Sequence, residues 1–151
     1  MIEYKIATAD DIELLMSSRL EMLREVNGLA ADQEFSEEIM EYSRDYFLSG
    51  DQTTVLALDG GRVIGCATIC YMVIMPTYSH PTGRRAHLMN VYTAKDHRRQ
   101  GVARRMMEMI LEDARNNSAT EISLDATESG RPLYESMGFT GSDECMVMVL
   151  L

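Results

Sequence analysis

The chain has only three cysteines, none of them in a Cys-x-x-Cys pair. Cys66 and Cys70 lie four residues apart in an apolar stretch that we expect to be a strand. At ~3.3 Å per residue their Cα atoms would lie about 13 Å apart, whereas a disulfide needs them within about 7 Å. We therefore expect reduced thiols. The histidines at 80, 87 and 97 lack the spacing of metal ligands, and we expect no metal.

Long apolar runs are also missing. No run of about 18 apolar residues is present, so no membrane segment is predicted. Residues 1–5 lack the apolar core of a signal peptide, and we expect a cytoplasmic protein with no membrane partner.

Positive charge is scarce. Lys and Arg number 14 against 24 Asp and Glu, which gives a formal net charge of −10 at pH 7. Nucleic-acid binders carry a basic stripe, so this balance argues against a nucleic-acid partner. The arginines instead cluster at 84–85, 98–99 and 104–105. Local basic clusters on an acidic body suit an anionic cofactor beside a cationic second ligand, although an acidic surface also keeps proteins soluble.

What is present is the size and patterning of one domain over residues 1–151. Helical spacing, alternation and turn residues predict ten elements. In order, these are a strand at 2–7, a helix from about 9 to 26, a helix at 34–48, strands at 53–58 and 62–75 joined by Asp59-Gly60-Gly61, a strand at 86–93, a helix ending near 116, a strand at 120–126, a helix at 128–137 and a closing hairpin with a strand at 145–150. We therefore expect an α+β fold with a mixed, mostly antiparallel central sheet flanked by about four helices. The segment 76–85 could be a substrate-side loop or only a long hairpin connection.

The stretch from 89 to 105 is the one around which the rest is organised. An apolar strand pattern passes through a basic turn and Gly101 into a helical pattern. The first turn of a helix leaves about four backbone N–H groups unpaired, and the helix dipole adds partial positive charge there. Arg98, Arg99 and Arg104 add full charges, so the pattern predicts a pyrophosphate site. A surface turn with a solvated basic patch is the alternative. Neither Gly-Lys-Ser/Thr nor Gly-x-Gly-x-x-Gly is present, which excludes a P-loop and a Rossmann turn.

Arg98-x-x-Gly101-x-Ala103 after such a strand resembles the acetyl-CoA motif, Gln/Arg-x-x-Gly-x-Gly/Ala, of the GNAT superfamily of N-acetyltransferases. The resemblance continues in Leu-Tyr-Glu-Ser-Met-Gly-Phe at 133–139. It covers the second half of the chain well and the first half in layout only. Arg99 stands where many relatives carry glycine, which changes a side chain but leaves the backbone donors available. The resemblance implies the GNAT architecture, acetyl-CoA as cosubstrate without a metal, and a homodimer.

The resemblance also implies which residues contact the cosubstrate. In the family, the strand before the motif splays from a parallel neighbour, here 120–126, and exposes backbone groups to pantetheine. The thioester and pantetheine contacts fall on Val91, Tyr92 and Thr93, although an ordinary core strand would look equally apolar. The pyrophosphate contacts fall on Arg98, Arg99, Gln100, Gly101, Val102, Ala103 and Arg104.

Tyr134 is the leading candidate for the general acid. A phenol with a pKa near 10 is protonated at pH 7 and can donate to a departing thiolate of pKa ~8.5. Its place in the second motif matches the family's tyrosine acid. The alternative is a helix tyrosine that packs its ring and donates to a backbone carbonyl.

The base is less well defined. Asp125 lies at the end of the predicted strand that faces the cosubstrate and is the first candidate, but it could equally cap the next helix. Glu21 and Glu25 are alternatives that could instead be solvated or paired. Asn90 could position a water or the substrate, or satisfy a β-bulge. Cys145 could carry an acyl group, but a buried strand thiol fits it better.

These observations predict direct transfer from acetyl-CoA to the amine of a small-molecule or amino-acid-like acceptor, with a cationic acceptor favoured by the acidic body. Two other functions stay open: a catalytically silent acyl-CoA-binding sensor, and a protein N-terminal or lysine acetyltransferase. We expect acceptor selectivity to come from residues 19–28, 72–85 and 139–145.

Overall fold

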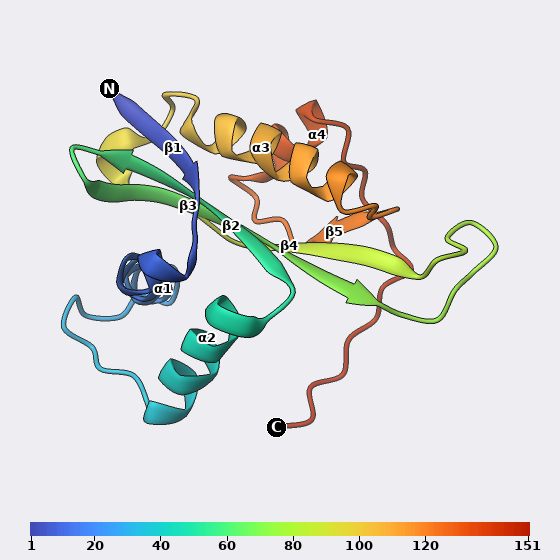
Figure 1. Ribbon diagram of the computed structural model, residues 1–151, viewed down its shortest axis with the longest axis horizontal. Helices are drawn as coiled ribbons and strands as arrows, with labels where there is room; N and C mark the ends of the chain where they lie inside the picture. Colours follow the sequence, from blue (N-terminus) through green and yellow to red (C-terminus); the bar gives the residue numbers. More distant parts are fainter.

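A five-stranded sheet forms the centre of the molecule, with helices on both faces (Figure 1). The computed structural model describes all of residues 1–151. The strands are β1 (Ile2–Ile6), β2 (Gln52–Asp59), β3 (Arg62–Val73), β4 (Arg84–Thr93) and β5 (Ile122–Leu124), and they neighbour one another in chain order. All pairs are antiparallel except β4 and β5, which are parallel. The predicted mixed, mostly antiparallel sheet is confirmed.

Four α-helices flank this sheet. They are α1 (Ile12–Val26), α2 (Glu37–Ser49), α3 (Val102–Asn116) and α4 (Arg131–Ser136), with 3₁₀ turns η1 (Ala9–Asp11) and η2 (Lys95–His97). In Figure 1, α1 and α2 lie below the sheet, whereas α3 and α4 lie above it. No helix has the length and apolar character needed to cross a membrane.

Local side-chain chemistry decides where the first two helices begin. The backbone N–H of Thr8 donates to the Asp11 carboxylate at 2.9 Å, which fixes the turn into α1. Ser36 accepts from the backbone N–H of Ile39 at 3.3 Å. Serine is a preferred N-cap, so α2 begins at residue 37 and not at the predicted 34.

The apolar face of α3 supplies much of the core. Met106, Met107 and Ile110 are fully buried, and Ala114 nearly so, as the helical spacing predicts. In the first turn Val102 is buried and Ala103 beside it is only partly buried. Burying this face fixes the N-terminus of α3 against the sheet.

A bulge in β4 is the irregularity that matters most for the site. Cys66 of β3 pairs with Tyr92, whereas Thr68 pairs with Met89, so three steps along β4 oppose two along β3. Asn90 lies inside the bulge with a left-handed backbone (φ 58°). An extra residue of this kind changes the direction in which the following side chains point.

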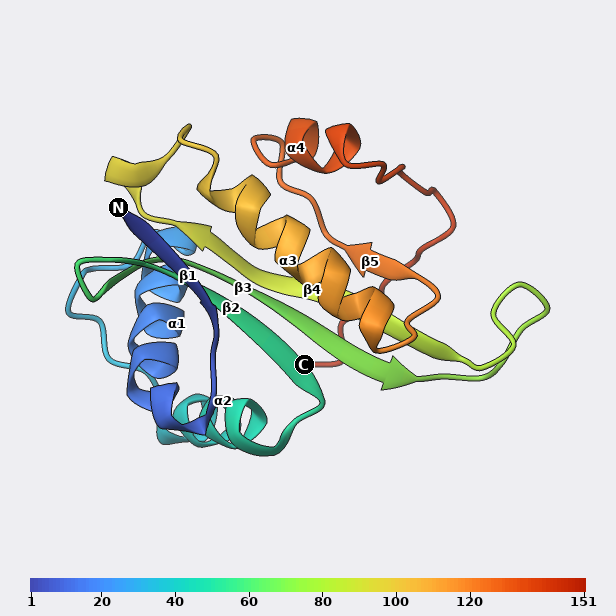
Figure 2. The same ribbon diagram turned by 45° about the horizontal axis from the view of Figure 1, so that its top comes forward.

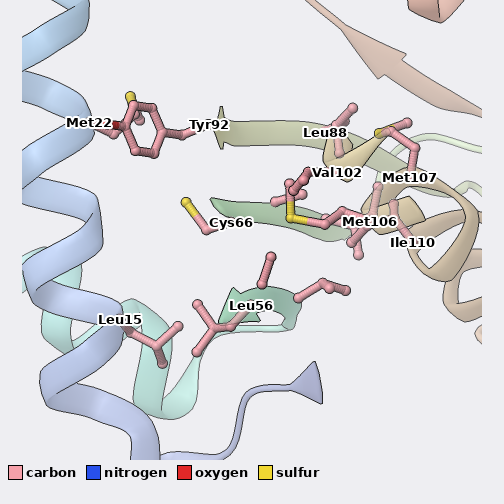
Figure 3. Packing of buried hydrophobic residues seen from close by; sticks show 14 of the residues in the cluster. Leu15, Met22, Leu56, Cys66, Leu88, Tyr92, Val102, Met106, Met107 and Ile110 are labelled. Carbon is pink, nitrogen blue, oxygen red and sulfur yellow. The ribbon is translucent and has the colours of Figure 1, made fainter. Parts of the chain in front are cut away.

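The bulge moves the later side chains of β4 to the other face of the sheet. Leu88 and Tyr92 are an even number of residues apart and would share a face in a regular strand. Figure 3 instead shows Leu88 beside Met107 of α3, and Tyr92 beside Met22 of α1.

The parallel pair β4–β5 is short. Only Ala86, His87 and Leu88 of β4 pair with β5, and Figure 2 shows the chain leaving β5 toward α4 directly afterwards. Beyond Leu88, this edge of β4 has no strand partner. The predicted splay of these strands is therefore present.

The segment between β3 and β4 is a hairpin connection that projects from the sheet (Figures 1 and 2). The backbone N–H of Ile74 donates to Gly83 at 2.9 Å and continues the pairing of Val73 with Arg84. The segment 76–85 is therefore a long hairpin connection between β3 and β4.

The prediction of a closing strand at 145–150 was wrong. No strand follows β5, and the residues from Met146 to Leu151 are exposed. Strand propensity alone does not make a strand, because its stability comes from packing and pairing against a neighbour.

Candidate active site

The N-terminus of α3 has no side-chain cap. Gly101 is the N-cap, in a left-handed conformation (φ 81°), and no side chain caps the helix. The first hydrogen bond of the helix runs from the Arg105 N–H to the Gly101 carbonyl at 3.0 Å. The N–H groups of the first turn therefore remain available, with the positive end of the helix dipole behind them. Arg99 is also left-handed (φ 61°), and successive N–H groups in such a turn form an anion-binding nest.

A cavity of about 260 Å³ opens at this helix end. It is lined by Thr93, His97, Arg98, Arg99, Gly101, Val102, Ala103, Arg104 and Leu133. Of the residues predicted to contact the cosubstrate, only Val91, Tyr92 and Gln100 do not line it. Gly101 has nothing near the position of a β-carbon, so its backbone is open to a ligand.

Arg98 is engaged by the protein itself. Its Nη2 donates to Glu25 on α1 at 2.6 Å, and its Nε donates to the Thr93 carbonyl at 2.9 Å. The Tyr92 hydroxyl and the Arg98 guanidinium together hold the pKa of Glu25 below its ordinary value. Arg98 therefore braces the end of β4 against α1, and Glu25 is a structural partner of the motif.

Arg104 joins the two sequence motifs. Its Nη2 donates to the Ser136 hydroxyl of α4 at 2.6 Å. Ser136 donates in turn to the Leu133 carbonyl at 2.6 Å, and Leu133 lines the cavity at α3. The second motif is thereby held beside the first.

His97 fixes the turn before the motif, a role that was not predicted from the sequence. Its Nε2 lies 2.8 Å from Asp59 at the end of β2, and its Nδ1 lies 2.9 Å from Asp96. Hydrogen bonds to Asp59 first and to Asp96 second raise the pKa of His97 above its ordinary value. Asp59 is 38 positions away in sequence, so no local pattern signals this contact.

Tyr134 of α4 is half-buried, with its ring edge-on to Phe139 at a centroid distance of 5.9 Å. Burial raises the pKa of its phenol. The alternative prediction had this hydroxyl donating to a backbone carbonyl, but Tyr134 makes no side-chain hydrogen bond within the chain. Its proton is therefore available to a ligand.

Asn90 joins α1 to the sheet. Its Nδ2 donates to Thr68 at 3.1 Å, and its Oδ1 accepts from the Arg19 guanidinium at 3.2 Å. Its backbone carbonyl accepts from the Cys66 thiol at 3.3 Å. Burial raises the pKa of that thiol to about 12, so Cys66 stays protonated.

Asp125 lies just after β5, on the β5 side of the gap between β4 and β5. Its side chain is 99% exposed, and its Oδ2 is 3.8 Å from Nε2 of His87. His87 also contacts the Ser123 hydroxyl through Nδ1 at 2.7 Å. Asp125 does not cap α4, because the Thr127 hydroxyl accepts from the Gly130 N–H at 3.1 Å.

A second cavity, of about 350 Å³, lies where α1 and α2 face β3 and β4. It is lined by Arg19, Ile39, Tyr42, Ser43, Tyr46, Phe47, Thr68, Cys70, Met89 and Asn90. Asn90 thus stands between the splayed edge of β4 and a pocket on the other side of the bulge. No group of three or more His, Cys, Asp or Glu side chains is placed to hold a metal ion.

Comparison with known proteins gives consistent results. A family model described as "Acetyltransferase (GNAT) family" matches residues 20–139. The crystal structure of a predicted acetyltransferase with acetyl-CoA from Clostridium acetobutylicum is 29% identical, with a TM-score of 0.87 over 99% of this chain and 97% of that one. A GCN5-related N-acetyltransferase from Ralstonia eutropha JMP134, at 22% identity and a TM-score of 0.81, covers 99% of both chains and shares the fold.

The matches to two curated relatives cover less of each chain. N-acetyltransferase family 8 member 2 of Rattus norvegicus is 26% identical over 68% of this chain and 45% of its own length. Glucosamine 6-phosphate N-acetyltransferase of Trypanosoma brucei brucei is 24% identical over 57% of this chain and 56% of its own length. The chain thus spans about half the length of these relatives.

Proposed function

Because this chain belongs to the acetyltransferase (GNAT) family, we propose that it is an acetyl-CoA-dependent N-acetyltransferase. It moves an acetyl group directly to the amine of a small-molecule or amino-acid-like acceptor. The observation that carries the proposal is the parting of β4 from β5 beside the uncapped N-terminus of α3. The acetyl-CoA described with the Clostridium acetobutylicum relative supports the same ligand here.

The residues present suit two parts of acetyl-CoA, its diphosphate and its pantetheine. The first-turn N–H groups of α3 and the Arg99 and Arg104 side chains bind the diphosphate. The edge of β4 from Val91 to Thr93 offers backbone groups to pantetheine, because β5 pairs no further than Leu88. Arg98 supports this edge from behind through its bond to Thr93.

When bound, acetyl-CoA supplies an activated acetyl thioester. A backbone N–H of 91–93 that faces the thioester carbonyl stabilises the negative charge on its oxygen, by about 3–4 kcal/mol for one well-aimed donor. Tyr134 gives its phenolic proton to the departing sulfur as the acceptor nitrogen bonds to the carbonyl carbon. Burial keeps that phenol protonated until transfer, because it raises the pKa. Asn90 orients the acceptor at the bulge.

The acceptor amine must lose a proton. Deprotonating a lysine-like amine at pH 7 costs about 4.6 kcal/mol. We assign Asp125 as the proton acceptor, acting with His87 through water, because this pair lies where β4 and β5 begin to part. Glu25 is excluded from that role by its bond to Arg98, which depends on its charge.

The experiment is an acceptor screen with purified protein and acetyl-CoA, followed by thioester absorbance and by mass spectrometry of the products. Amine-dependent loss of the thioester with an N-acetylated product supports the proposal. Acetyl-CoA binding without turnover for any acceptor supports a sensor instead. Acetylation of peptides but of no small amine supports a protein N-terminal or lysine acetyltransferase.

We also propose a homodimer in which the apolar segment Met146–Leu151 pairs with the open edge of β5 in a second copy. The segment is exposed throughout, and β5 has a strand neighbour on one side only. An exposed apolar segment and a free strand edge both favour pairing with another chain. Light scattering should give twice the chain mass for the full-length protein. After deletion of 146–151 it should give the mass of a single chain.

The three thiols support a cytoplasmic location, because Cys66, Cys70 and Cys145 are all free. Fractionation of the source cells tests this directly.

A further inference from the structure

Arg19 is a charged side chain that the protein itself leaves uncompensated. It projects from α1 into the second cavity, and its one hydrogen bond is to the neutral Asn90 side chain at 3.2 Å. No carboxylate of the chain lies within 4.0 Å of it. Burial lowers the pKa of this guanidinium, which reflects the cost of keeping a cation away from water. Arg19 is partly buried, and a charge in such a place is stabilised when an anion is placed against it.

The rest of that cavity is apolar or neutral. Ile39, Tyr42, Tyr46 and Phe47 form a wall along α2, and no Asp or Glu side chain lines the pocket. The α2 helix has no buried residue, so this wall remains available to a ligand. Cys70 adds no negative charge, because burial raises its pKa.

The position of Asn90 connects this pocket to the chemistry. Asn90 is hydrogen-bonded to Arg19, and the strand residues that follow it, 91–93, are those proposed to hold the thioester. An anion held by Arg19 therefore lies next to the bulge. In an α-amino acid, a single carbon separates the carboxylate from the amine, so the amine falls beside Asn90.

We infer that the acceptor is an α-amino acid with a free carboxylate and an apolar or aromatic side chain. The Arg19 guanidinium binds the carboxylate, and the wall of α2 packs against the side chain. A guanidinium suits this role because its fork matches a carboxylate with two parallel hydrogen bonds. This inference rests on the proposed acetyltransferase function and names its substrate class.

The pocket changes one expectation from the sequence. The net charge of −10 favoured a cationic acceptor, but the only charged group in the pocket is a cation. The negative charge of the molecule is distributed elsewhere, so a polyamine gains no carboxylate partner here and meets like charge.

The test uses matched acceptors on the wild-type protein. Phenylalanine is compared with phenethylamine, and leucine with 3-methylbutylamine, since each pair differs only by the carboxylate. We expect the amino acid to have a kcat/KM at least about tenfold higher in each pair, in line with a lost charge-assisted contact. Glucosamine 6-phosphate and spermidine complete the panel, because the first offers an anion without an apolar side chain and the second only cations.

Arg19→Met should lower kcat/KM for phenylalanine at least about tenfold more than for phenethylamine. Arg115→Met is the matched control, because this exposed arginine lies at the far end of α3. Calorimetry of N-acetylphenylalanine with the CoA-loaded protein provides a readout without turnover. Binding should be lost in Arg19→Met and kept in Arg115→Met, while acetyl-CoA affinity and thermal midpoint report that each variant is folded.

Equal or better turnover of the decarboxylated amines or of spermidine would overturn the inference and leave the acetyltransferase function standing. Preference for glucosamine 6-phosphate would also overturn it, because the anion would then be bound without the apolar side chain. Arg19-dependent binding of N-acetylphenylalanine with no turnover of any amine would refute the proposed function and the acceptor inference with it, and would leave only a carboxylate-binding site at Arg19.

Discussion

Arg98 opens the acetyl-CoA motif, yet its guanidinium is held 2.6 Å from the carboxylate of Glu25, 73 residues earlier in the chain. This bond ties α1 to the end of β4. Because Glu25 lies on the same helix as Arg19, the brace links the proposed acceptor pocket to the proposed cosubstrate site.

Glu25→Gln should lower the free energy of unfolding by about 0.5–1 kcal/mol at pH 7, since the pair is partly exposed. The folded-state pKa of Glu25 is lowered, so its contribution is full above its ordinary pKa of 4.5 and is lost as pH falls through the lowered value. Urea denaturation at several pH values measures this. Glu21→Gln on the same helix is the control. A loss that persists at low pH would contradict the assignment.

Gly101→Ala tests the helix end. Alanine in this left-handed conformation (φ 81°) should lower the free energy of unfolding by about 1 kcal/mol. The substitution should also tilt the first-turn N–H groups and so weaken acetyl-CoA binding about tenfold. Gly61→Ala is a matched control, because Gly61 has nearly the same backbone (φ 83°) and nothing near its β-carbon position. It should show the same stability loss with unchanged affinity. Equal affinities in both variants would remove Gly101 from the site.

His97→Gln should destabilise the protein most at pH values below the ordinary histidine pKa of 6.5. The pKa of His97 is raised, so its contribution is present below 6.5 and is lost as pH rises through the raised value. Thermal midpoints measured from about pH 5.5 to 8.5 follow this, since the range begins about one pH unit below the ordinary pKa and continues above it. Asp59→Asn removes the same contact, so a double variant should add little. Additive losses would show that the two residues act separately.

Much of the layout could be predicted because it depends on short stretches. Asp59-Gly60-Gly61 gives a hairpin in which Asp59 pairs with Arg62, and Gly138 ends α4 with a left-handed backbone (φ 103°). The order of strand, glycine and helix start likewise predicts an anion site at Gly101, because helix ends carry their own unpaired donors.

The rest depends on contacts between distant segments, which leave no local pattern. Asn90 and Arg19 are 71 positions apart. A β-bulge at Asn90 was one alternative from the sequence and is present, but nothing in the surrounding apolar run shows that it reverses the strand faces. The closing strand was predicted wrongly for the same reason, since β propensity at 145–150 does not supply a paired edge. Asp125 was identified from its place at the end of a predicted strand, but only the structure shows that it lies just after β5 and how exposed it is.

Tyr134→Phe should lower kcat at least about tenfold with little change in acetyl-CoA affinity or stability. The hydroxyl has no partner in the chain, so removing it leaves no hydrogen-bonding group unpaired, and the contact with Phe139 stays. Steady-state kinetics across pH give the answer, with the exposed Tyr78→Phe as control. Unchanged turnover at every pH would remove Tyr134 from the mechanism.

Cys145 should be the only cysteine that alkylates rapidly in the native protein. Burial raises the pKa of Cys66 to about 12 and also raises that of Cys70, whereas Cys145 is exposed. Mass spectrometry after brief iodoacetamide treatment locates the modified residue. Cys145→Ser should keep its turnover, and loss of turnover would instead indicate an acyl-carrying thiol.

The most direct test of the site compares acetyl-CoA with S-acetylpantetheine, which lacks the nucleotide diphosphate, by calorimetry on the wild-type protein. If the N-terminus of α3 binds the diphosphate, acetyl-CoA should bind at least about 100-fold more tightly. Equal affinities would contradict a diphosphate site at this helix.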